Sequence, residues 1–429
     1  METPVGDRSL GVRSLVPVAD ARAYVLDRCR GLAPVERPLD EAGGLVLAVP
    51  VHAAHDVPPF ANSAMDGYAL RAADTAGAPV TLSVVGAVMA GETPVTPVGR
   101  GQAVRIMTGA PVPGGADAVC KVERTRPGDD GTVVVEATVS VGDNVRLPGE
   151  DIAAGSAVFG PGTVLAPSHV GVLASLGIET VTVHPRPRVA VVATGDELVG
   201  GSDPLAPGKI RDANRPALLA RLRADGFDPV DLGRVGDEPA AVAAVLAAGA
   251  AASDAVLVTG GVSVGDRDVA KAVLADLCGD DMRWMQVAVK PGKPFAFGIL
   301  ASTGTPVFGL PGNPVSALVS YELFARPGLR RLAGHVAVDR PRLAAVALAD
   351  LRRRSDGKLH LVRVVVETGP DGCLGVRPAA GQASHQLRAM AEADALAIVP
   401  DGDGVPAGGR VEVLVTDANR VAGPDRTWP

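Results

Sequence analysis

Five short loops that combine glycine with charged or polar residues follow apolar runs between Arg188 and Gly334. They are TGDE (Thr194 to Glu197), VGDE (Val235 to Glu238), TGGVSVGDRD (Thr259 to Asp268), KPGKP (Lys290 to Pro294) and LPGNP (Leu310 to Pro314). Glycine lets the backbone approach a ligand and present N–H groups to an oxyanion. Asn313 and Pro314 suit the N-cap and first position of a helix, whose free N–H groups attract anions. One such loop would be an ordinary turn, but the set predicts a phosphate site.

The charged residues of these loops fall into two groups. Carboxylates crowded around a phosphate site require a hard cation such as Mg2+ between them; the candidates are Glu197, Asp237, Glu238, Asp266 and Asp268. Glu238 and Asp266 equally suit helix capping, because each precedes a helical run. Lys290 and Lys293 flank a rigid Pro-Gly turn, and we expect their ammonium groups to serve a second, small oxyanion.

Further candidates lie outside this segment. Asp66 occurs in PPFANSAMDGYAL and Thr108 precedes a glycine in RIMTGAPVP, although the first motif alone could be a tight turn at a domain entry. Arg363 lies in the middle of the apolar run LHLVRVVVE, where a solvated strand residue is the alternative, and Ser384 lies in GQASHQLRAM. The histidines form no spaced cluster, so zinc and a histidine base are not indicated.

The elements around the five loops indicate an α/β domain over residues 185–334. Short β-branched runs such as RVAVVATG and AVLVTGG alternate with alanine- and leucine-rich helical runs such as RPALLARLRADG. This alternation predicts βαβ units and a doubly wound, largely parallel sheet covered on both faces. Ligands bind such sheets beyond the carboxyl ends of the strands, where the loops are expected.

The flanking segments are predicted to be β-rich. Residues 57–147 carry short valine-rich runs between Gly and Pro turns, which indicates a small β-rich domain. Residues 335–420 again show β runs, which suit a small barrel. We expect residues 8–56 and 148–184 to form a discontinuous linking lobe that contains a helix around Val18 to Arg30 and a hairpin. The chain is therefore expected to be an α/β plus β multidomain protein.

Composition excludes several classes of protein. The net charge of −7 and the 3% of aromatic residues argue against nucleic-acid binding. The cysteines (Cys29, Cys120, Cys278 and Cys373) lack the spacing of zinc or redox sites and indicate a reducing compartment. The N-terminus has no apolar core of the signal-peptide type, and no uncharged stretch reaches the roughly 20 apolar residues of a membrane span. We expect a cytoplasmic protein that binds neither membranes nor nucleic acids.

The motifs together resemble a known family. PPFANSAMDGYA, RIMTGAPVP, GEDI, TGDEL, TGGVSVGDRD, KPGKPFAFG and LPGNPVSA are similar, in that order, to motifs of the molybdopterin molybdenumtransferases, the bacterial MoeA proteins related to the gephyrin E domain. The resemblance covers Val18 to Thr416. It implies a four-lobed homodimer that inserts molybdate into adenylylated molybdopterin and releases AMP, and that could contact other cofactor-biosynthesis proteins or molybdoenzymes.

The resemblance also implies roles for individual residues. Mg2+ and the pterin phosphate would be handled by Glu197, Asp237 and Asp268, which with Lys290 and Lys293 form the catalytic set. Molybdate would be bound by Lys290, Lys293, Pro294, Ser316, Arg363 and Ser384. The pterin nucleotide would be bound by Asp66, Thr108, Asn214, Thr259, Gly260, Gly261, Ser263, Gly312, Asn313 and Pro314, of which Asp66 and Thr108 would come from the other subunit.

The sequence departs from the family pattern at three positions. Ala61 replaces an aspartate, Ala213 a serine and Ala383 a glycine, and none of these changes removes an assigned charge. The sequence leaves two alternative functions. A molybdopterin adenylyltransferase lacks the flanking lobes and has Thr-Gly-Gly-Thr-Gly where this chain has Thr259 to Ser263. A non-catalytic scaffold of the gephyrin type would not need the charged set at the strand ends.

Overall fold

The computed structural model describes residues 15–202, 204–261, 269–368 and 373–417. The chain forms two compact units. The described residues of 15–35, 44–46 and 184–417 belong to the first unit, and residues 36–43 and 47–183 belong to the second. The first unit holds the five loops.

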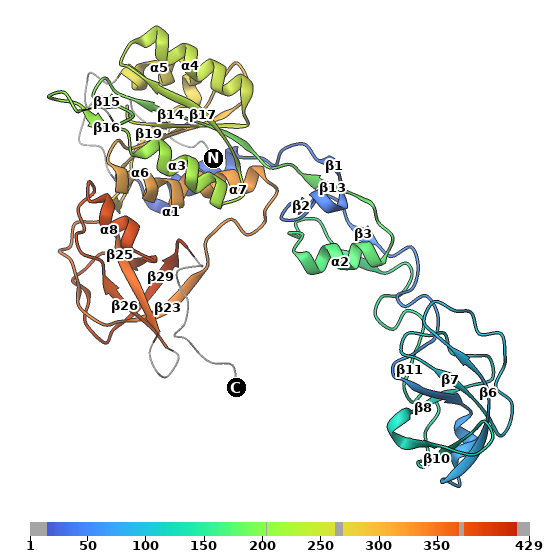
Figure 1. Cartoon of the computed structure of the whole chain (residues 1–429). Helices are drawn as coiled ribbons and strands as arrows, with labels where there is room; N and C mark the ends of the chain where they lie inside the picture. The colour runs from blue at the N-terminus through green and yellow to red at the C-terminus, as the bar shows by residue number, and fades with distance from the viewer. Residues whose placement is uncertain (1–14, 203, 262–268, 369–372, 418–429) are drawn as a thin grey trace, which may run out of the picture. The chain divides into compact units, whose positions relative to one another are not determined.

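A mixed six-stranded sheet organises the first unit (Figure 1). In sheet order its strands are β17 (Asp228–Val235), β14 (Arg188–Thr194), β18 (Ala255–Thr259), β22 (Pro306–Leu310), β21 (Pro294–Ile299) and β19 (Arg283–Gln286). The strands from β17 to β22 are parallel, whereas β21 is antiparallel to both of its neighbours. Hydrogen-bonded β15 (Leu198–Val199) and β16 (Ile210–Arg211) project beside the sheet. The predicted largely parallel sheet is confirmed.

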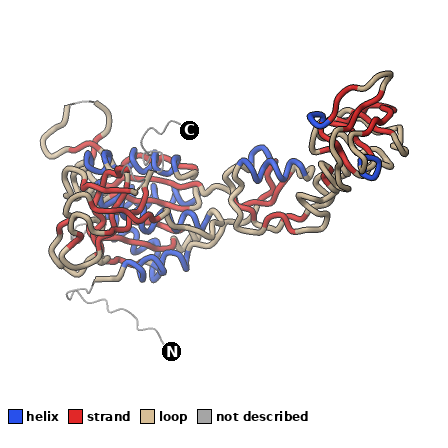
Figure 2. Tube along the Cα trace, turned by 90° about the horizontal axis from the view of Figure 1, so that it is seen from below, coloured by secondary structure: helices blue, strands red, loops and turns tan. Residues whose placement is uncertain are grey.

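Helices cover both faces of this sheet, as Figure 2 shows. One face packs against α4 (Pro239–Ala252) and α5 (Val269–Cys278) through an Ala, Val and Leu core. The other face packs against α1 (Val18–Arg28), α3 (Asn214–Ala224), α6 (Pro314–Ser320) and α7 (Arg326–Leu332), and a 3-10 turn spans Gly279–Asp281. The apolar runs of the central strands are buried on both sides, as a doubly wound sheet requires.

The position of α1 differs from the sequence prediction, which assigned this helix to the linking lobe. Ala21, Val25 and Cys29 are buried in the core beneath the sheet. A hydrogen bond to the segment that leads into α7 accounts for part of the contact. Pro327 has no N–H to donate to the carbonyl of Leu323, four residues earlier, and that carbonyl accepts from Arg22 Nη1 at 2.5 Å. Helix α1 therefore packs on the α/β domain.

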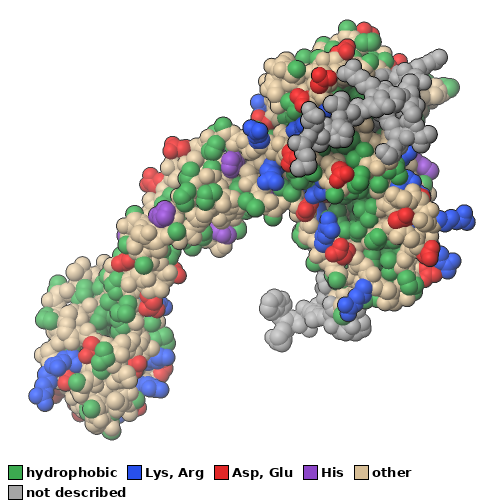
Figure 3. All heavy atoms as spheres, turned by 180° about the vertical axis from the view of Figure 1, so that it is seen from behind, with side chains coloured by type: hydrophobic (Ala, Val, Ile, Leu, Met, Phe, Trp, Pro, Cys, Tyr) green, Lys and Arg blue, Asp and Glu red, His purple; other side chains and the backbone are tan. Residues whose placement is uncertain are grey.

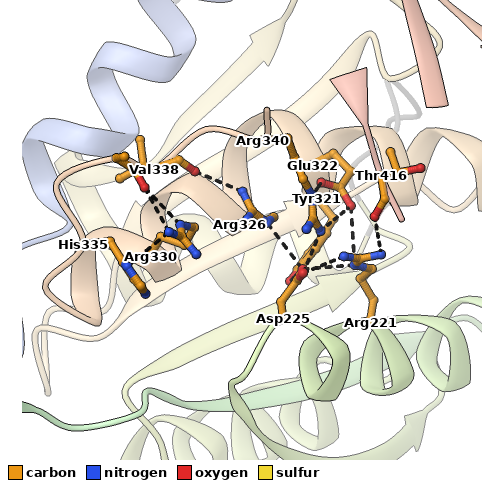
Figure 4. A network of polar contacts seen from close by, with 11 residues as sticks. Arg221, Asp225, Tyr321, Glu322, Arg326, Arg330, His335, Val338, Arg340 and Thr416 are labelled. Carbon is orange, nitrogen blue, oxygen red and sulfur yellow. Dashed lines mark hydrogen bonds and ion pairs between the residues drawn. The ribbon is translucent and has the colours of Figure 1, made fainter. Parts of the chain in front are cut away.

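The helix predicted after LPGNP is interrupted by a π-helical turn at Tyr321–Ala325, between α6 and α7. The turn presents Tyr321 and Glu322 to a buried ionic network (Figure 4). Asp225 accepts from Tyr321 Oη at 2.8 Å and from Arg340 Nη2 at 2.6 Å, and Arg221 donates to the carbonyl of Thr416 at 2.9 Å. Burial raises the pKa of Asp225, but bonds from Arg221 and the charge of Arg340 outweigh burial and hold it below its usual range.

The C-terminal part of the first unit is a closed β-barrel. In order, its strands are β25 (Leu359–Thr368), β26 (Leu374–Pro378), β23 (Arg342–Ala347), β29 (Arg410–Val415) and β27 (Ala395–Val399), and β27 pairs with β25 to close the ring. The pair β24 (Leu351–Arg352) and β28 (Gly404–Val405) and the helix α8 (Leu387–Glu392) complete it. Strand β20 (Val289–Lys290) of the α/β domain pairs with β25. The predicted barrel is confirmed.

The second unit is β-rich. Its main sheet contains β8 (Ala118–Lys121), β5 (Gly67–Leu70), β7 (Gln102–Ile106), β6 (Val80–Val88), β10 (Thr132–Val135) and β9 (Thr125–Pro127). Shorter elements are β1 (Val35–Pro38), β2 (Val46–Leu47), β3 (Val51–His52), β4 (Asn62–Ser63), β11 (Val145–Arg146), β12 (Ala157–Phe159), β13 (Thr180–His184), α2 (Pro167–Ser175) and 3-10 turns at Leu39–Glu41, Ala72–Thr75 and Val122–Arg124. Valine-rich strands bury two small cores on this sheet.

Charged side chains of both signs occur on the surface (Figure 3). On the face seen in Figure 3, basic and acidic side chains are interspersed. None of the helices in the described ranges is long and apolar enough to cross a membrane. Cys29, Cys120 and Cys278 are buried free thiols, and Cys373 is exposed.

Candidate functional site

The described residues of all five loops lie at one edge of the α/β sheet. The loops after β14, β17, β18 and β22 lie at the carboxyl ends of parallel strands. KPGKP reaches the same edge from the other direction, because it precedes β21, which is antiparallel to β22 with Ala296 opposite Gly309. The predicted common edge is correct, although the fifth loop lies at the amino end of its strand.

A cavity of about 550 Å3 lies at this edge. Residues from four of the loops, the start of α3 and the barrel line it, and they include the predicted Glu197, Asn214, Thr259, Gly260, Pro294, Gly312, Asn313 and Pro314 together with Thr194, Asp212 and His385. Gly261 directly follows Gly260, whereas Ser263, Asp266 and Asp268 lie outside the described residues. Most of the residues predicted to bind the nucleotide therefore share one cavity.

Asn214 is held in this wall by two hydrogen bonds. Its Nδ2 donates to Thr259 Oγ1 at 2.7 Å and to the carbonyl of Gly312 at 2.8 Å. Gly260 packs directly on Thr194, because a Cβ at Gly260 would lie 2.5 Å from the carbonyl oxygen of Thr194. These contacts connect α3 with the loops after β14, β18 and β22 and fix the shape of the cavity.

The start of α6 differs from the sequence prediction in one respect. The helix begins at Pro314, as expected, but Asn313 makes no capping hydrogen bond with its side chain. Both residues line the cavity. Asn313 therefore places its amide at the cavity wall without using it as a cap.

The carboxylates have distinct environments. Glu238 is a cap, because it accepts from the N–H groups of Ala240 at 3.1 Å and Ala241 at 2.7 Å at the start of α4. Asp237 and Asp196 join the loops after β17 and β14. The N–H of Asp237 donates to Asp196 Oδ1 at 3.0 Å, and the N–H of Asp196 donates to Asp237 Oδ2 at 3.3 Å. Sequence reasoning gave Asp196 no role, although it lies within the TGDE motif.

Glu197 and Asp237 suit a hard cation in their chemistry. Their carboxylates follow neighbouring strands, and Glu197 borders the cavity. Within the described ranges, no three His, Cys, Asp or Glu side chains gather closely enough to hold a metal ion. Mg2+ commonly uses one or two carboxylates and takes its other ligands from substrate phosphate and water. The two carboxylates are therefore compatible with Mg2+ bound together with a phosphorylated substrate.

Three of the residues predicted for molybdate, Ser316, Arg363 and Ser384, lie in segments that meet where α6 contacts the barrel. The N–H of Val315 donates to the carbonyl of Ser384 at 3.1 Å, which brings Ser384 next to Ser316. Gly292, between the two lysines, packs on the same helix turn, because its Cβ position lies 3.7 Å from the carbonyl oxygen of Ser316. Arg363 reaches the adjoining loop through Nη2, which donates to the carbonyls of Gly381 at 3.0 Å and Ala383 at 3.4 Å.

Arg363 is buried completely, with 0% of its surface exposed. The alternative of a solvated strand residue is therefore wrong. Burial lowers the pKa of its guanidinium, and Nε and Nη1 have no hydrogen-bond partner. A buried cation with unused donors is unfavourable unless another group supplies acceptors.

The two lysines are exposed on their turn. Lys290 forms the end of β20 and lies opposite His360 in β25. It lines a second cavity of about 640 Å3, whose wall also includes Arg352, Arg354 and Gln382. Gln382 is a functional candidate that sequence reasoning missed. Its side chain bonds to both backbone groups of Arg363: Oε1 accepts from the Arg363 N–H at 3.1 Å, and Nε2 donates to the Arg363 carbonyl at 2.9 Å.

Asp66 and Thr108 are brought together in the second unit. Asp66 Oδ1 accepts from the N–H of Thr108 at 2.7 Å and from its hydroxyl at 2.8 Å. These two bonds hold the pKa of the exposed Asp66 carboxyl below its usual range. The pair therefore presents an ionised carboxylate on a fixed turn.

Each of the three positions that depart from the family pattern lies at or beside a local hydrogen bond. Ala213 cannot cap α3, but Asp212 Oδ1 accepts from the N–H of Arg215 at 3.1 Å. Ala383 donates its N–H to Gln386 Oε1 at 2.8 Å. The carbonyl of Ala61 accepts from the N–H of Val112 at 3.0 Å.

Comparison with known proteins covers almost the whole chain. Residues 16–177 match the family model "MoeA N-terminal region (domain I and II)", residues 190–331 match "Probable molybdopterin binding domain", and residues 345–416 match "MoeA C-terminal region (domain IV)". A Mycobacterium tuberculosis protein named molybdopterin molybdenumtransferase 2 is 40% identical over 392 residues, which are 90% of this chain and 95% of the relative.

Two further relatives have names of the same family. A Nostoc molybdopterin molybdenumtransferase is 37% identical over 87% of this chain and 86% of its own length. A crystal structure of a molybdopterin biosynthesis moeA protein from Pyrococcus horikoshii is 28% identical, with a TM-score of 0.80 over 94% of this chain and all of that chain. From these matches and the site geometry, the chain belongs to the MoeA family of molybdopterin molybdenumtransferases.

Proposed function

We propose that this enzyme inserts molybdate into adenylylated molybdopterin and releases AMP. The proposal is carried by the buried Arg363, which has unused N–H donors and whose Nη2 bonds to the carbonyl of Ala383, the residue before Ser384. Family membership supports the reaction class. A small dianion requires several charge-assisted donors that converge, and this part of the chain offers a guanidinium, two ammonium groups and two hydroxyls.

The residues would divide the substrates between two regions. The pterin nucleotide occupies the 550 Å3 cavity, against Asn214, Thr259 and the glycines of the loops. Molybdate lies next to it, with Arg363, Lys290 and Lys293 neutralising charge and with Ser316, Ser384 and Pro294 forming the wall. Catalysis then consists of positioning and electrostatic stabilisation rather than a covalent enzyme intermediate.

Mg2+ belongs with the carboxylates in this proposal. Glu197 and Asp237 hold it, together with Asp268, which lies outside the described residues. When bound, the ion neutralises the phosphate charge and polarises the phosphoanhydride. The reciprocal bonds between Asp196 and Asp237 keep the two loops in place for this role.

The proposed assembly is a cytoplasmic homodimer. Asp66 and Thr108 are proposed to bind the nucleotide. They belong to a different compact unit from Arg363 and Asn214. An isologous dimer would let each chain complete the cleft of the other. In that arrangement the Asp66 carboxylate of one subunit serves the nucleotide bound by its partner.

The test is the release of AMP from adenylylated molybdopterin when molybdate is added to the purified protein. We expect release that depends on both molybdate and Mg2+. Formation of the adenylylated substrate from ATP and molybdopterin, without consumption on molybdate addition, would assign the chain to adenylyl transfer instead.

A further inference from the structure

The ionic network in Figure 4 lies where the α/β domain meets the barrel. Its two carboxylates are Asp225, at the end of α3, and Glu322, in the π-helical turn, and both side chains are buried. Arg340, which lies just before β23, donates to both: Nη2 to Asp225 Oδ1 at 2.6 Å and Nε to Glu322 Oε2 at 2.9 Å. One arginine therefore connects two elements of the α/β domain with the start of the barrel.

The network also reaches the end of β29. Arg221 of α3 donates to Asp225 Oδ1 at 2.5 Å and to the carbonyl of Thr416, directly after β29, at 2.9 Å. Strands β23 and β29 are antiparallel neighbours with Arg342 opposite Leu414, so the start of β23 and the end of β29 lie side by side. The network therefore holds both strands at the same end of the barrel.

The barrel is attached to the α/β domain at a second place, on its other side. Strand β25, which carries Arg363, pairs with β20 of the α/β domain. In the ring β25 pairs with β26 and β27, and these two strands separate it from β23 and β29. Two separated attachments fix the orientation of the barrel, whereas the β20 pairing without the network would leave rotation about that pairing.

Backbone hydrogen bonds connect the network with the strand of Arg363. The N–H of Thr416 donates to the carbonyl of Asp394 at 3.3 Å, and the N–H of Asp394 donates to the carbonyl of Val364 at 2.9 Å. Val364 directly follows Arg363 in β25. A displacement of the chain at Thr416 would therefore be transmitted to the backbone beside Arg363.

Charge balance alone does not require Arg340. Within the described chain, Arg221, Arg326 and Arg340 form ion pairs with the two carboxylates, although two arginines would balance them. Burial lowers the pKa of Arg326, and the charge of Arg340 lowers it further. Burial also lowers the pKa of Arg340, but the bonds to Glu322 and the charges of both carboxylates outweigh burial and hold it above its usual range. The third arginine is thus firmly bound yet unfavourable for its neighbour, which favours a role at the barrel.

We propose that Arg340 is a positioning residue that sets the orientation of the barrel and, through it, the position of Arg363 relative to α6. The inference rests on the proposed function in one respect, the assignment of Arg363 to molybdate. The attachment of the barrel by Arg340 does not depend on which reaction the enzyme catalyses.

Arg340→Gln is the decisive variant, because it cuts the attachment and leaves two arginines with two carboxylates. The molybdate concentration for half-maximal AMP release should rise roughly two- to thirtyfold, the range of couplings carried by packed networks. Half-saturation by the nucleotide should change much less. Arg340→Lys, which keeps the charge and can bond to one carboxylate, should recover part of the loss.

Tyr321→Phe is the matched control. It removes the 2.8 Å bond from Tyr321 Oη to the same carboxylate of Asp225, but this bond lies within the α/β domain. The control should lower the melting temperature and leave half-saturation by molybdate unchanged. An equal rise in the molybdate requirement in Tyr321→Phe and Arg340→Gln would show that the network acts only through stability, and would overturn the inference.

A distance measurement tests the orientation without any substrate. Spin labels are placed at Arg410→Cys on β29 and Asp276→Cys on α5, both exposed positions, in a Cys373→Ser background that removes the exposed native cysteine. The labelled protein is mixed with excess unlabelled protein, so that pulsed electron resonance reports the distance within one chain. Arg340→Gln should shift or broaden the distance distribution, and Tyr321→Phe should not. An unchanged distribution in Arg340→Gln overturns the inference.

The outcomes separate this inference from the proposed function. A changed distribution in Arg340→Gln, together with a wild-type protein that releases no AMP on molybdate addition, would refute only the proposed reaction. Molybdate-dependent AMP release with the same molybdate requirement in Arg340→Gln and wild type would refute only the inference, because the position of Arg363 would then not depend on Arg340.

Discussion

Replacing Arg363 with methionine should weaken the use of molybdate far more than the use of the nucleotide. Of the five N–H donors of a guanidinium, the two on Nη2 face the carbonyls of Gly381 and Ala383. The donors on Nε and Nη1 have no partner in the chain. Methionine fills a similar volume but removes the charge and all of these donors.

The magnitude follows from the donors available to the oxyanion. A hydrogen bond to a charged group contributes about 1.5 to 3 kcal/mol. Each 1.4 kcal/mol corresponds to about a factor of ten in affinity. Loss of one such bond by Arg363→Met should therefore raise the molybdate concentration for half-maximal AMP release roughly ten- to a hundredfold, and loss of two bonds should raise it further.

The assay measures AMP release over a range of molybdate concentrations at saturating nucleotide, and then over a range of nucleotide concentrations at saturating molybdate. Arg22→Met is the control, because Arg22 bonds only to Leu323 and Asp339 within the described chain. It should lower the melting temperature and leave half-saturation by molybdate unchanged. If Arg363→Met raises the requirement for nucleotide and not the requirement for molybdate, then Arg363 holds the pterin phosphate and our division of the site is wrong.

Three other predictions concern the metal, the assembly and pH. Asp237→Asn keeps the bond to the Asp196 N–H but removes a charge, so the Mg2+ concentration for half-maximal AMP release should rise; an unchanged Mg2+ titration would exclude Asp237 as a ligand. A mixture of inactive Asp66→Ala and inactive Asp237→Ala proteins should regain activity after subunit exchange, and no recovery after verified exchange would place each site within one chain. Burial, with the charges of Arg330 and Arg326, lowers the pKa of His335 from 6.5 to about 4. Between these values only the unfolded chain binds the proton, so the free energy of unfolding should fall as pH decreases through this window. His335→Gln should flatten that dependence in urea titrations, and an unchanged slope would contradict the assignment.

The common edge of the loops was predictable from sequence because it depends on local patterns. Short β-branched runs that alternate with helical runs determine a parallel sheet, and a parallel sheet places the ends of its strands together. The TGDE, VGDE and LPGNP motifs needed no tertiary information. KPGKP reached the same edge only because β21 reverses direction, and its apolar run gives no sign of this reversal.

Other features depend on contacts between distant residues. The packing of α1 involves the bond from Arg22 to the carbonyl of Leu323, which is 301 positions away. The burial of Arg363 was equally impossible to predict from the local sequence. In LHLVRVVVE the alternation of side chains places Arg363 and Val364 on opposite faces, and both are fully buried. A strand buried on both faces loses the polar and apolar alternation that would have identified the face of the arginine.

The packing of the barrel indicates that the proposed oxyanion site is largely formed before ligands bind. Leu361, Leu396 and Leu414 of the barrel belong to the same hydrophobic core as the α/β sheet and α6. Strand β20 ties the lysine turn to β25, the strand that carries Arg363. The network in Figure 4 adds the bonds from Arg340 to Asp225 and from Arg221 to the carbonyl of Thr416. Because the core, the strand pairing and the ionic network would all have to be disrupted for the barrel to swing away, the distance between Arg363 and the lysines is set by folding rather than by closure around the ligand.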